Sequence, residues 1–146
     1  MQLTQFTDYS LRALIYISLR NELCTISDIA NAYRISSNHL VKIIHNLSKM
    51  GIIKTVRGKS GGITMALNPS SINLGELILQ LEPNFDLVPC FNQEKANCCI
   101  APVCRLKRIL FEARKVFMAV LKEYTLADIL HNRGELNQLL NIDDLV

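Results

Sequence analysis

Several features that are common in proteins are scarce or missing in this chain of 146 residues. Tryptophan is absent and aromatic residues make up only 6% of the sequence, which argues against a core built entirely from β-sheet. No apolar run approaches the roughly 20 residues that a membrane span needs. The N-terminus has no basic group ahead of an apolar block, so we expect no signal peptide. We therefore place the protein in the cytoplasm, where thiols stay reduced.

Acidic residues are missing from a long stretch of the chain. None occurs between Asp28 and Glu76, although six basic residues do. A field of one sign over a compact segment suits a polyanionic partner, whereas an ordinary solvated surface would explain the charges equally well. Apolar residues make up 49% of the chain, so we expect it to fold, as one domain or as a small domain with an appendage.

Apolar spacing predicts three helices before residue 51. The first covers residues 3–20, and a short second helix is capped by Thr25 or Ser27. Ser36 is a suitable N-cap for the third helix, and Gly51 ends it. The third helix has an apolar stripe at helical spacing, formed by Leu40, Ile43, Ile44 and Leu47.

The second and third helices, from about Asp28 to Gly51, predict a helix-turn-helix. In this motif the second helix enters the major groove. Amide side chains can pair there with adenine edges, and hydroxyl or basic side chains can contact phosphates or guanine. The polar face of this helix and its leading turn supply the candidate DNA-binding residues, which are Ser36, Ser37, Asn38, His39, Lys42 and His45.

Two β-rich runs, residues 52–57 and 63–67, flank a glycine-rich turn and predict a hairpin. A hairpin directly after a recognition helix is a wing. The tip of this wing, from Arg57 to Gly62, carries Arg57 and Lys59, which suit the minor groove. Unlike a P-loop, the turn does not open a helix, so we expect no nucleotide binding.

The second half of the chain predicts two more helices. The one after Asn73 stops at Pro83, a loop covers residues 83–103, and a long helix runs from about Pro102 to Tyr124. The apolar stripe of the long helix is too wide for the small winged domain to cover. We therefore expect a homodimer, although packing within one chain would also cover the stripe. The expected division is a winged helix-turn-helix domain at 1–82, a cysteine-bearing loop at 83–104, a dimerisation helix with the following turn at 105–132 and a loosely held tail at 133–146.

Four of the five cysteines fall between Cys90 and Cys104. Cys90, Cys98 and Cys104 are spaced more widely than the ligands of zinc knuckles, and a loop of this kind could wrap a body larger than one ion. An iron–sulfur cluster normally takes four ligands, mostly thiolates, so three well-spaced cysteines leave one position open. The candidates for that position are Cys99, Cys24, His39 and Asp8. On spacing alone, a zinc site and a thiol redox switch remain alternatives.

Six short stretches, spread over nearly the whole chain, occur in the same order in a known family. They are Phe6-Thr-Asp-Tyr-Ser-Leu-Arg-Ala-Leu-Ile-Tyr16, Asn38-His-Leu-Val-Lys-Ile-Ile44, Val56-Arg-Gly-Lys-Ser-Gly-Gly-Ile63, Leu81-Glu-Pro83, Cys104-Arg-Leu-Lys107 and Tyr124-Thr-Leu-Ala-Asp128. On these stretches the chain resembles the iron–sulfur winged-helix regulators, and within them the nitric-oxide-sensing repressors. The resemblance implies a mainly α fold with a small β-hairpin wing and a long C-terminal dimerisation helix.

The resemblance also implies a set of cluster ligands. These are Cys90, Cys98 and Cys104, completed by Asp8 from the partner subunit. Cys99 directly follows Cys98 and could replace it as a ligand. Members of the IscR type use a histidine near the cysteines, whereas here no histidine lies between residues 45 and 131. Cys24 has no counterpart in the motif, and we interpret it as a core thiol.

We therefore expect a transcriptional repressor and not an enzyme. The resemblance implies that it binds double-stranded operator DNA as a homodimer and carries a [4Fe-4S] or [2Fe-2S] cluster. It further implies that nitric oxide, as the effector, nitrosylates the cluster and so releases the DNA. The alternatives are an iron–sulfur-status regulator of the IscR type and a thiol redox sensor without a cluster.

Overall fold

The computed structural model describes residues 2–142. Its elements are helices α1 (Gln5–Leu19), α2 (Ile26–Tyr33) and α3 (Ser37–Lys49), strands β1 (Ile53–Val56) and β2 (Gly62–Met65), and helices α4 (Leu74–Leu81), α5 (Arg105–Lys122) and α6 (Arg133–Leu139). Short 3-10 turns lie at Pro69–Ser71 (η1), Pro89–Phe91 (η2) and Asp128–Leu130 (η3). This mainly helical architecture with one antiparallel hairpin confirms the predicted fold class. Within residues 2–142, no helix is long and apolar enough to span a bilayer.

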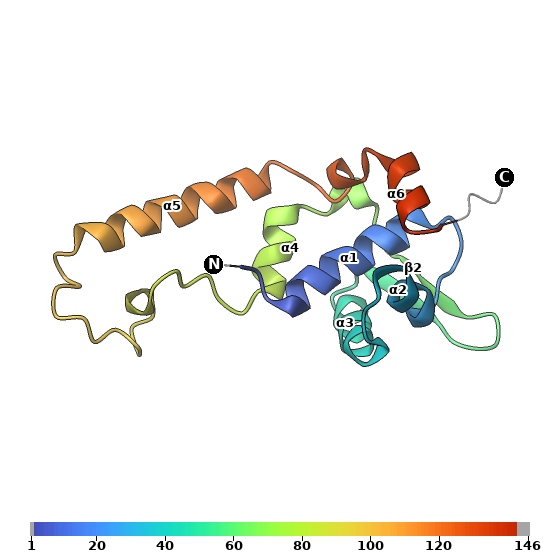
Figure 1. The fold of residues 1–146 in the computed structure, drawn as a ribbon, viewed down its shortest axis with the longest axis horizontal. Coiled ribbons are helices and arrows are strands. Elements are labelled where there is room, and N and C mark those ends of the chain that lie inside the picture. Colours follow the sequence, from blue (N-terminus) through green and yellow to red (C-terminus); the bar gives the residue numbers. More distant parts are fainter. Residues whose placement is uncertain (1, 143–146) are drawn as a thin grey trace.

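Helix α1 lies at the centre of the winged domain, where it packs against α2, α3, α4 and β2 (Figure 1). Its inward face includes Leu14 and Ile17, which are almost fully buried. Two polar residues, Thr7 and Ser10, are buried on the same helix. The Ser10 hydroxyl donates to the carbonyl of Phe6 at 2.7 Å, so its hydrogen bond is satisfied within the helix.

The helix-turn-helix is shaped by local caps. The Thr25 hydroxyl accepts from the Asp28 N–H at 3.2 Å, and the Asp28 carboxylate accepts from the Thr25 N–H at 2.7 Å, which forms a reciprocal capping box. Arg34 turns the chain in the left-handed conformation, with φ of 54°, before α3 begins. Ser36 occupies the predicted N-cap position, although its side chain makes no capping hydrogen bond. The predicted apolar stripe of α3 is buried at all four positions, Leu40, Ile43, Ile44 and Leu47.

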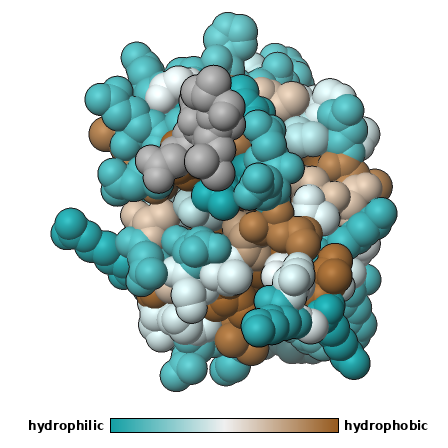
Figure 2. Space-filling model, turned by 90° about the vertical axis from the view of Figure 1, so that its right-hand side faces the viewer, coloured by the Kyte–Doolittle hydropathy of each residue, from teal (hydrophilic) through white to brown (hydrophobic). Residues whose placement is uncertain are grey.

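The hairpin is fastened to the segment between α1 and α2. Strands β1 and β2 pair with Ile53 opposite Met65 and Val56 opposite Gly62. The backbone of Cys24 adds two hydrogen bonds to Ile63, at 3.1 and 2.7 Å. Figure 2 shows the end of the molecule that carries the wing, where hydrophilic side chains cover most of the face and hydrophobic ones form smaller groups between them.

The start of α4 and the end of α5 are joined by hydrogen bonds. The Leu74 N–H donates to the carbonyl of Tyr124 at 2.9 Å, and the Asn73 side-chain amide donates to the carbonyl of Lys122 at 2.7 Å. The Asn73 side-chain oxygen also caps α4, accepting from the Glu76 N–H at 3.1 Å. The Lys122 ammonium pairs with Glu76 at 2.8 Å. Because α5 is fixed at this end, it projects away from the winged domain (Figure 1).

The long helix begins at Arg105, where the expected dimerisation segment starts and three residues after Pro102. It ends at Lys122, two residues before the expected Tyr124. Cys104 occupies the N-cap, where its sulfur accepts from the Lys107 N–H at 3.4 Å. A cysteine therefore satisfies one of the free N–H groups of the first turn, and the proline lies outside the helix.

The expectation of a loosely held tail from residue 133 is wrong for residues 133–142. Helix α6 occupies Arg133–Leu139, and Leu140 and Ile142 belong to the buried core. The Arg133 guanidinium donates to the carbonyl of Leu19, at the end of α1, at 3.2 Å. This segment therefore packs on the winged domain, whereas the expectation for 143–146 falls outside the described residues.

Helix α5 leaves its apolar side chains uncovered. None of its residues is buried within the chain. Its exposed large apolar side chains, each at least 40% accessible, are Leu106, Ile109, Phe111, Val116, Phe117 and Val120. An exposed apolar surface of this kind is typical of a protein–protein interface. The predicted homodimer would cover this surface, and the homodimer itself remains a prediction.

We expect Gly75→Ala to destabilise the junction between α4 and α5. A Cβ atom on Gly75 would lie 2.9 Å from the backbone nitrogen of Lys122 and would also meet the side chain of that residue. Overpacking of this kind costs about 1–3 kcal/mol, which outweighs the gain of about 1 kcal/mol from replacing a helical glycine by alanine. Thermal unfolding followed by circular dichroism would show a lower Tm.

Gly134→Ala is the matched control for this substitution. Gly134 lies in α6, and an added Cβ would meet no atom within 4 Å. The same chemical change should therefore raise the Tm there, because only the gain in helix propensity remains. Equal shifts for the two variants would contradict the packing argument at Lys122.

Candidate nucleic-acid interface and candidate metal centre

The solvent-facing side of α3 and its leading turn bring together the DNA-binding residues predicted there. All six are exposed, and they are Ser36, Ser37, Asn38, His39, Lys42 and His45. Residues 29–75 contain no Asp or Glu, so this part of the chain carries positive charge only. The arrangement leaves the polar face of α3 free to enter a major groove, and the contacts with DNA remain a prediction.

Two features of this surface were not predicted. Val41 is 52% exposed among the polar residues of α3, where its methyl groups could contact a thymine methyl. Because Val41 lies outside the apolar stripe of α3, its exposure could have been predicted from the sequence. In addition, Tyr9 of α1 lies beside His39, with ring centroids 6.2 Å apart, and accepts a hydrogen bond from the Gln5 side chain at 2.9 Å. Helix α1 thus supports the start of α3 directly.

The wing presents its two predicted basic residues, Arg57 and Lys59, at an exposed turn. Gly58 has φ of 111°, a conformation that side-chain-bearing residues rarely adopt. The Gly61 N–H donates to the carbonyl of Gly58 at 3.0 Å and closes the turn. Because strand β2 follows directly, this turn does not open a helix as a P-loop would.

The cysteine segment, defined here as residues 90–104, holds four free thiols. Cys90 is half-buried in η2, and Cys104 is half-buried at the N-cap of α5. Cys98 and Cys99 are exposed on the loop between them. Among residues 2–142, no three Cys, His, Asp or Glu side chains lie close enough together to hold a metal ion. The three predicted cysteine ligands therefore share one segment, but the structure does not gather them around a common point.

The donor chemistry of this segment nevertheless fits an iron–sulfur cluster. Thiolates are the usual ligands of such clusters, and Cys90, Cys98 and Cys104 supply three of them. The loop between them is held by short-range turns, such as the Ala101 N–H donating to the carbonyl of Cys98 at 3.1 Å. A loop with so few other contacts can rearrange at low cost. Both Cys98 and Cys99 are exposed, so the choice between them stays a prediction.

Asp8, the predicted ligand from the partner subunit, lies in the first turn of α1. Its carboxylate pairs with the Arg12 guanidinium at 2.9 Å, and that guanidinium lies 5.7 and 5.9 Å from the ring centroids of Tyr9 and Tyr33. Within one chain, the cysteine segment lies at the outer end of α5, away from α1 (Figure 1). A role for Asp8 at the cysteines therefore requires a second chain.

Cys24 is a core thiol, as we interpreted it from the sequence. It is fully buried, and its S–H points to the carbonyl of Ile63 at 3.6 Å. Burial raises the pKa of this thiol to about 11. A thiol that stays protonated inside the core is a poor metal ligand, because the thiolate is the form that binds metals.

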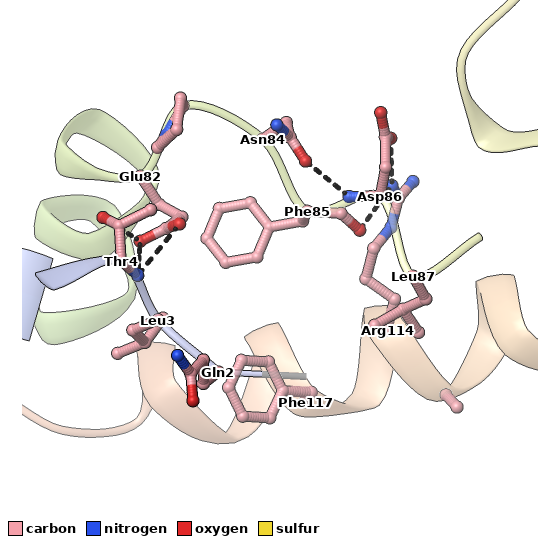
Figure 3. A pocket seen from close by; sticks show the side chains of 12 residues that line it. Gln2, Leu3, Thr4, Glu82, Asn84, Phe85, Asp86, Leu87, Arg114 and Phe117 are labelled. Atoms are coloured by element: carbon pink, nitrogen blue, oxygen red, sulfur yellow. Dashed lines mark hydrogen bonds and ion pairs between the residues drawn. The ribbon is translucent and has the colours of Figure 1, made fainter. Parts of the chain in front are cut away.

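A cleft of about 690 Å³ lies between residues 2–4, which directly precede α1, the start of the loop and α5 (Figure 3). On one side, the Glu82 carboxylate accepts from both the N–H and the hydroxyl of Thr4, each at 3.1 Å. On the other side, Arg114 of α5 donates to the carbonyl of Phe85 at 3.3 Å and faces Asp86 at 3.9 Å. Sequence reasoning missed this cleft because its partners lie far apart in the chain.

Comparison with known proteins finds matches over almost the entire chain. The model of the Rrf2 family, described as an iron-dependent transcriptional regulator, matches residues 3–132. The HTH-type transcriptional regulator NsrR of Bacillus licheniformis is 47% identical over 143 residues, which cover 97% of this chain and 100% of that protein. The NsrR of Shouchella clausii is 46% identical over 142 residues, which cover 96% of this chain and 95% of that protein. Among solved structures, T. potens IscR matches with a TM-score of 0.72 at 25% identity, covering 93% of this chain and 90% of that one.

Proposed function

The chain belongs to the Rrf2 family of transcriptional regulators, and on this premise we propose that it is a nitric-oxide-sensitive repressor. In this proposal it binds operator DNA as a homodimer and releases the DNA when its iron–sulfur cluster is nitrosylated. The observation that carries the proposal is the match, over 97% of the chain, to a regulator named NsrR. The exposed polar face of α3 and the free thiols of the cysteine segment support it.

The division of labour within the chain follows from this proposal. Residues 1–82, together with the packed segment 133–142, form the DNA-binding unit. Residues 83–104 form the cluster-binding loop, and residues 105–132 supply the dimerisation helix and its following turn. A two-fold dimer suits operators with two half-sites, because protein symmetry and operator symmetry then match.

Three thiolates from this chain, those of Cys90, Cys98 and Cys104, would hold the cluster, and Asp8 of the partner subunit would complete it. Cys99 is the alternative to Cys98 as a cluster ligand. A bound cluster would supply iron that reacts with nitric oxide. The protein must then convert a change at the cluster ligands into a change at the DNA-binding face.

Asp8 is well placed for that conversion. It lies on α1, and α1 packs against α3 and supports His39 through Tyr9. A tether between Asp8 and the partner subunit would fix the position of α1, and therefore the spacing of the two recognition helices. Without the tether, that spacing is free to change. A hundredfold difference in operator affinity corresponds to about 2.7 kcal/mol, within the usual range of coupling between two sites.

The cluster itself is tested by spectroscopy. Full-length protein purified without oxygen should show broad visible absorbance, and nitric oxide should bleach this absorbance. Nitric oxide should also weaken the binding of the protein to DNA fragments that were first selected for their affinity for it. A colourless protein that contains zinc would contradict the proposal. A cluster whose state alters DNA binding without any response to nitric oxide would favour a regulator of the IscR type instead.

The tether is tested by Asp8→Ala. We expect this variant to bind operator DNA up to about 100-fold more weakly before nitric oxide is added, because the recognition helices lose their fixed spacing. Titration by gel shift or fluorescence anisotropy measures the loss. Glu22→Ala removes an exposed acid just beyond the other end of α1 and should bind normally. Full affinity and full nitric oxide response in Asp8→Ala would remove Asp8 from the proposal.

The DNA-binding face is tested by Lys42→Ala. Each phosphate contact contributes about 0.9 to the slope of log affinity against log salt concentration, so a homodimer that loses one contact per subunit should lose about 1.8. Lys115→Ala removes the same charge from an exposed position on α5 and should leave the slope unchanged. An unaltered slope in Lys42→Ala would show that Lys42 does not contact phosphate.

A further inference from the structure

One side chain links the loop that carries the cysteines to the rest of the protein. Within the described part of the chain, every hydrogen bond or ion pair that joins residues 83–103 to another element is made by Arg114 of α5. Its guanidinium donates to the carbonyl of Phe85 at 3.3 Å and faces the Asp86 carboxylate at 3.9 Å (Figure 3). The other hydrogen bonds of this loop are internal turns.

The same guanidinium also contacts two aromatic rings. It lies 4.8 Å from the ring centroid of Phe91 and 4.9 Å from that of Phe111, and the two rings meet edge to face at 6.1 Å. Phe111 belongs to α5, whereas Phe91 directly follows Cys90 in η2. Cation–π contacts and edge-to-face ring pairs are both favourable, and the planar guanidinium of an arginine can also stack on aromatic faces. Arg114 therefore holds η2 against α5.

This contact fixes where Cys90 stands relative to Cys104. Cys104 is the N-cap of α5, and Phe111 follows it by about two helical turns, roughly 10 Å along the axis. Docking of Phe91 beside Phe111 keeps the neighbouring Cys90 near the first half of α5. Without Arg114, Cys90 would lie on a loop of more than 20 residues that, in the described part of the chain, has no hydrogen bond or ion pair to another element.

We propose that Arg114 is a positioning residue that holds Cys90 on α5, so that the cluster site is built on a rigid helix and not on a free loop. This inference rests on the proposed function, because it assumes that Cys90 is a ligand. The sequence alone does not reveal it, since Arg114 lies well outside the cysteine segment.

The docking is tested on the full-length apoprotein by thiol alkylation with iodoacetamide, read by mass spectrometry of tryptic peptides. Cleavage after Lys95 separates Cys90 from Cys98 and Cys99. In Arg114→Ala, the alkylation rate of Cys90 should rise about tenfold, the factor that corresponds to 1.4 kcal/mol. The rates of Cys98 and Cys99 should stay the same, because they are already exposed.

Two further variants make the test specific. Arg114→Lys keeps the charge but loses the planar group that contacts both rings, so it should resemble Arg114→Ala. Lys115→Ala removes one positive charge from the same turn of α5 and should resemble the wild type. An unchanged rate at Cys90 in Arg114→Ala would overturn the proposal. A rise that also includes the buried Cys24 would do so too, because it would indicate general unfolding.

The link to the cluster is tested separately, by following visible absorbance in the presence of a chelator. Arg114→Ala should lose its absorbance several-fold faster than the wild type and Lys115→Ala. Faster alkylation of Cys90 combined with an unchanged rate of cluster loss would overturn the positioning role. A wild-type protein that never forms a cluster would instead refute the proposed function, and the alkylation result would still decide whether Arg114 holds Cys90.

Discussion

The placement of the cysteines depends on how α5 is anchored. The Leu74 N–H donates to the carbonyl of Tyr124 at 2.9 Å, and the Leu126 N–H donates to the carbonyl of Ile72 at 2.8 Å. These bonds join the C-terminal end of α5 to the start of α4. With 18 residues, α5 is about 27 Å long, so its other end, which carries Cys104, is held far from the core. The chain that leaves α4 must therefore travel the length of α5 before the helix can begin. The long loop of residues 83–104 is a geometric consequence of this anchor.

The same geometry explains why so little of α5 is covered. Helix α4 is the element of the winged domain that packs on α5, and the loop that runs back along α5 makes its polar contacts through Arg114 alone within the described residues. The apolar stripe from Leu106 to Val120 is left in water, where it is unfavourable. A second copy of the chain offers an identical stripe, and pairing two such helices would cover both at once. The proposed mechanism requires that this pairing also bring the cysteine loop of one chain to the first helix of the other, because within one chain they lie apart.

Short-range sequence patterns predicted the winged domain well, but they did not predict the long-range contacts. The stripe of α3, the cap at Thr25 and the hairpin all depend on residues within a few positions of each other. Helix α6 was missed because Leu140 and Ile142 become buried only against distant elements, although their apolar character was visible. Pro102 was expected in the first turn of the long helix, but Cys104 provides the N-cap and the proline lies before it. Arg114 was missed for a similar reason, since its aromatic partner Phe91 lies more than 20 positions away. The positions of the thiols relative to one another could not be derived from their spacing in the sequence, because most of the loop that carries them has no regular structure to define their directions.

In the proposed mechanism, sensing and DNA binding are linked through the packing of α1 against α3. A surface ion pair such as Asp8 with Arg12 contributes only about 0.2–1 kcal/mol, less than the roughly 2.7 kcal/mol that a hundredfold change in affinity requires. The difference must therefore come from the placement of whole elements and not from one contact. Because α1 and α3 are packed closely against each other, a displacement of α1 would carry α3 with it. In the proposed dimer, a small displacement of the first turn of α1 would change the separation of two recognition helices. Two half-sites a fixed number of base pairs apart tolerate little change in that separation, so the affinity for the operator would fall while each helix kept its own surface intact.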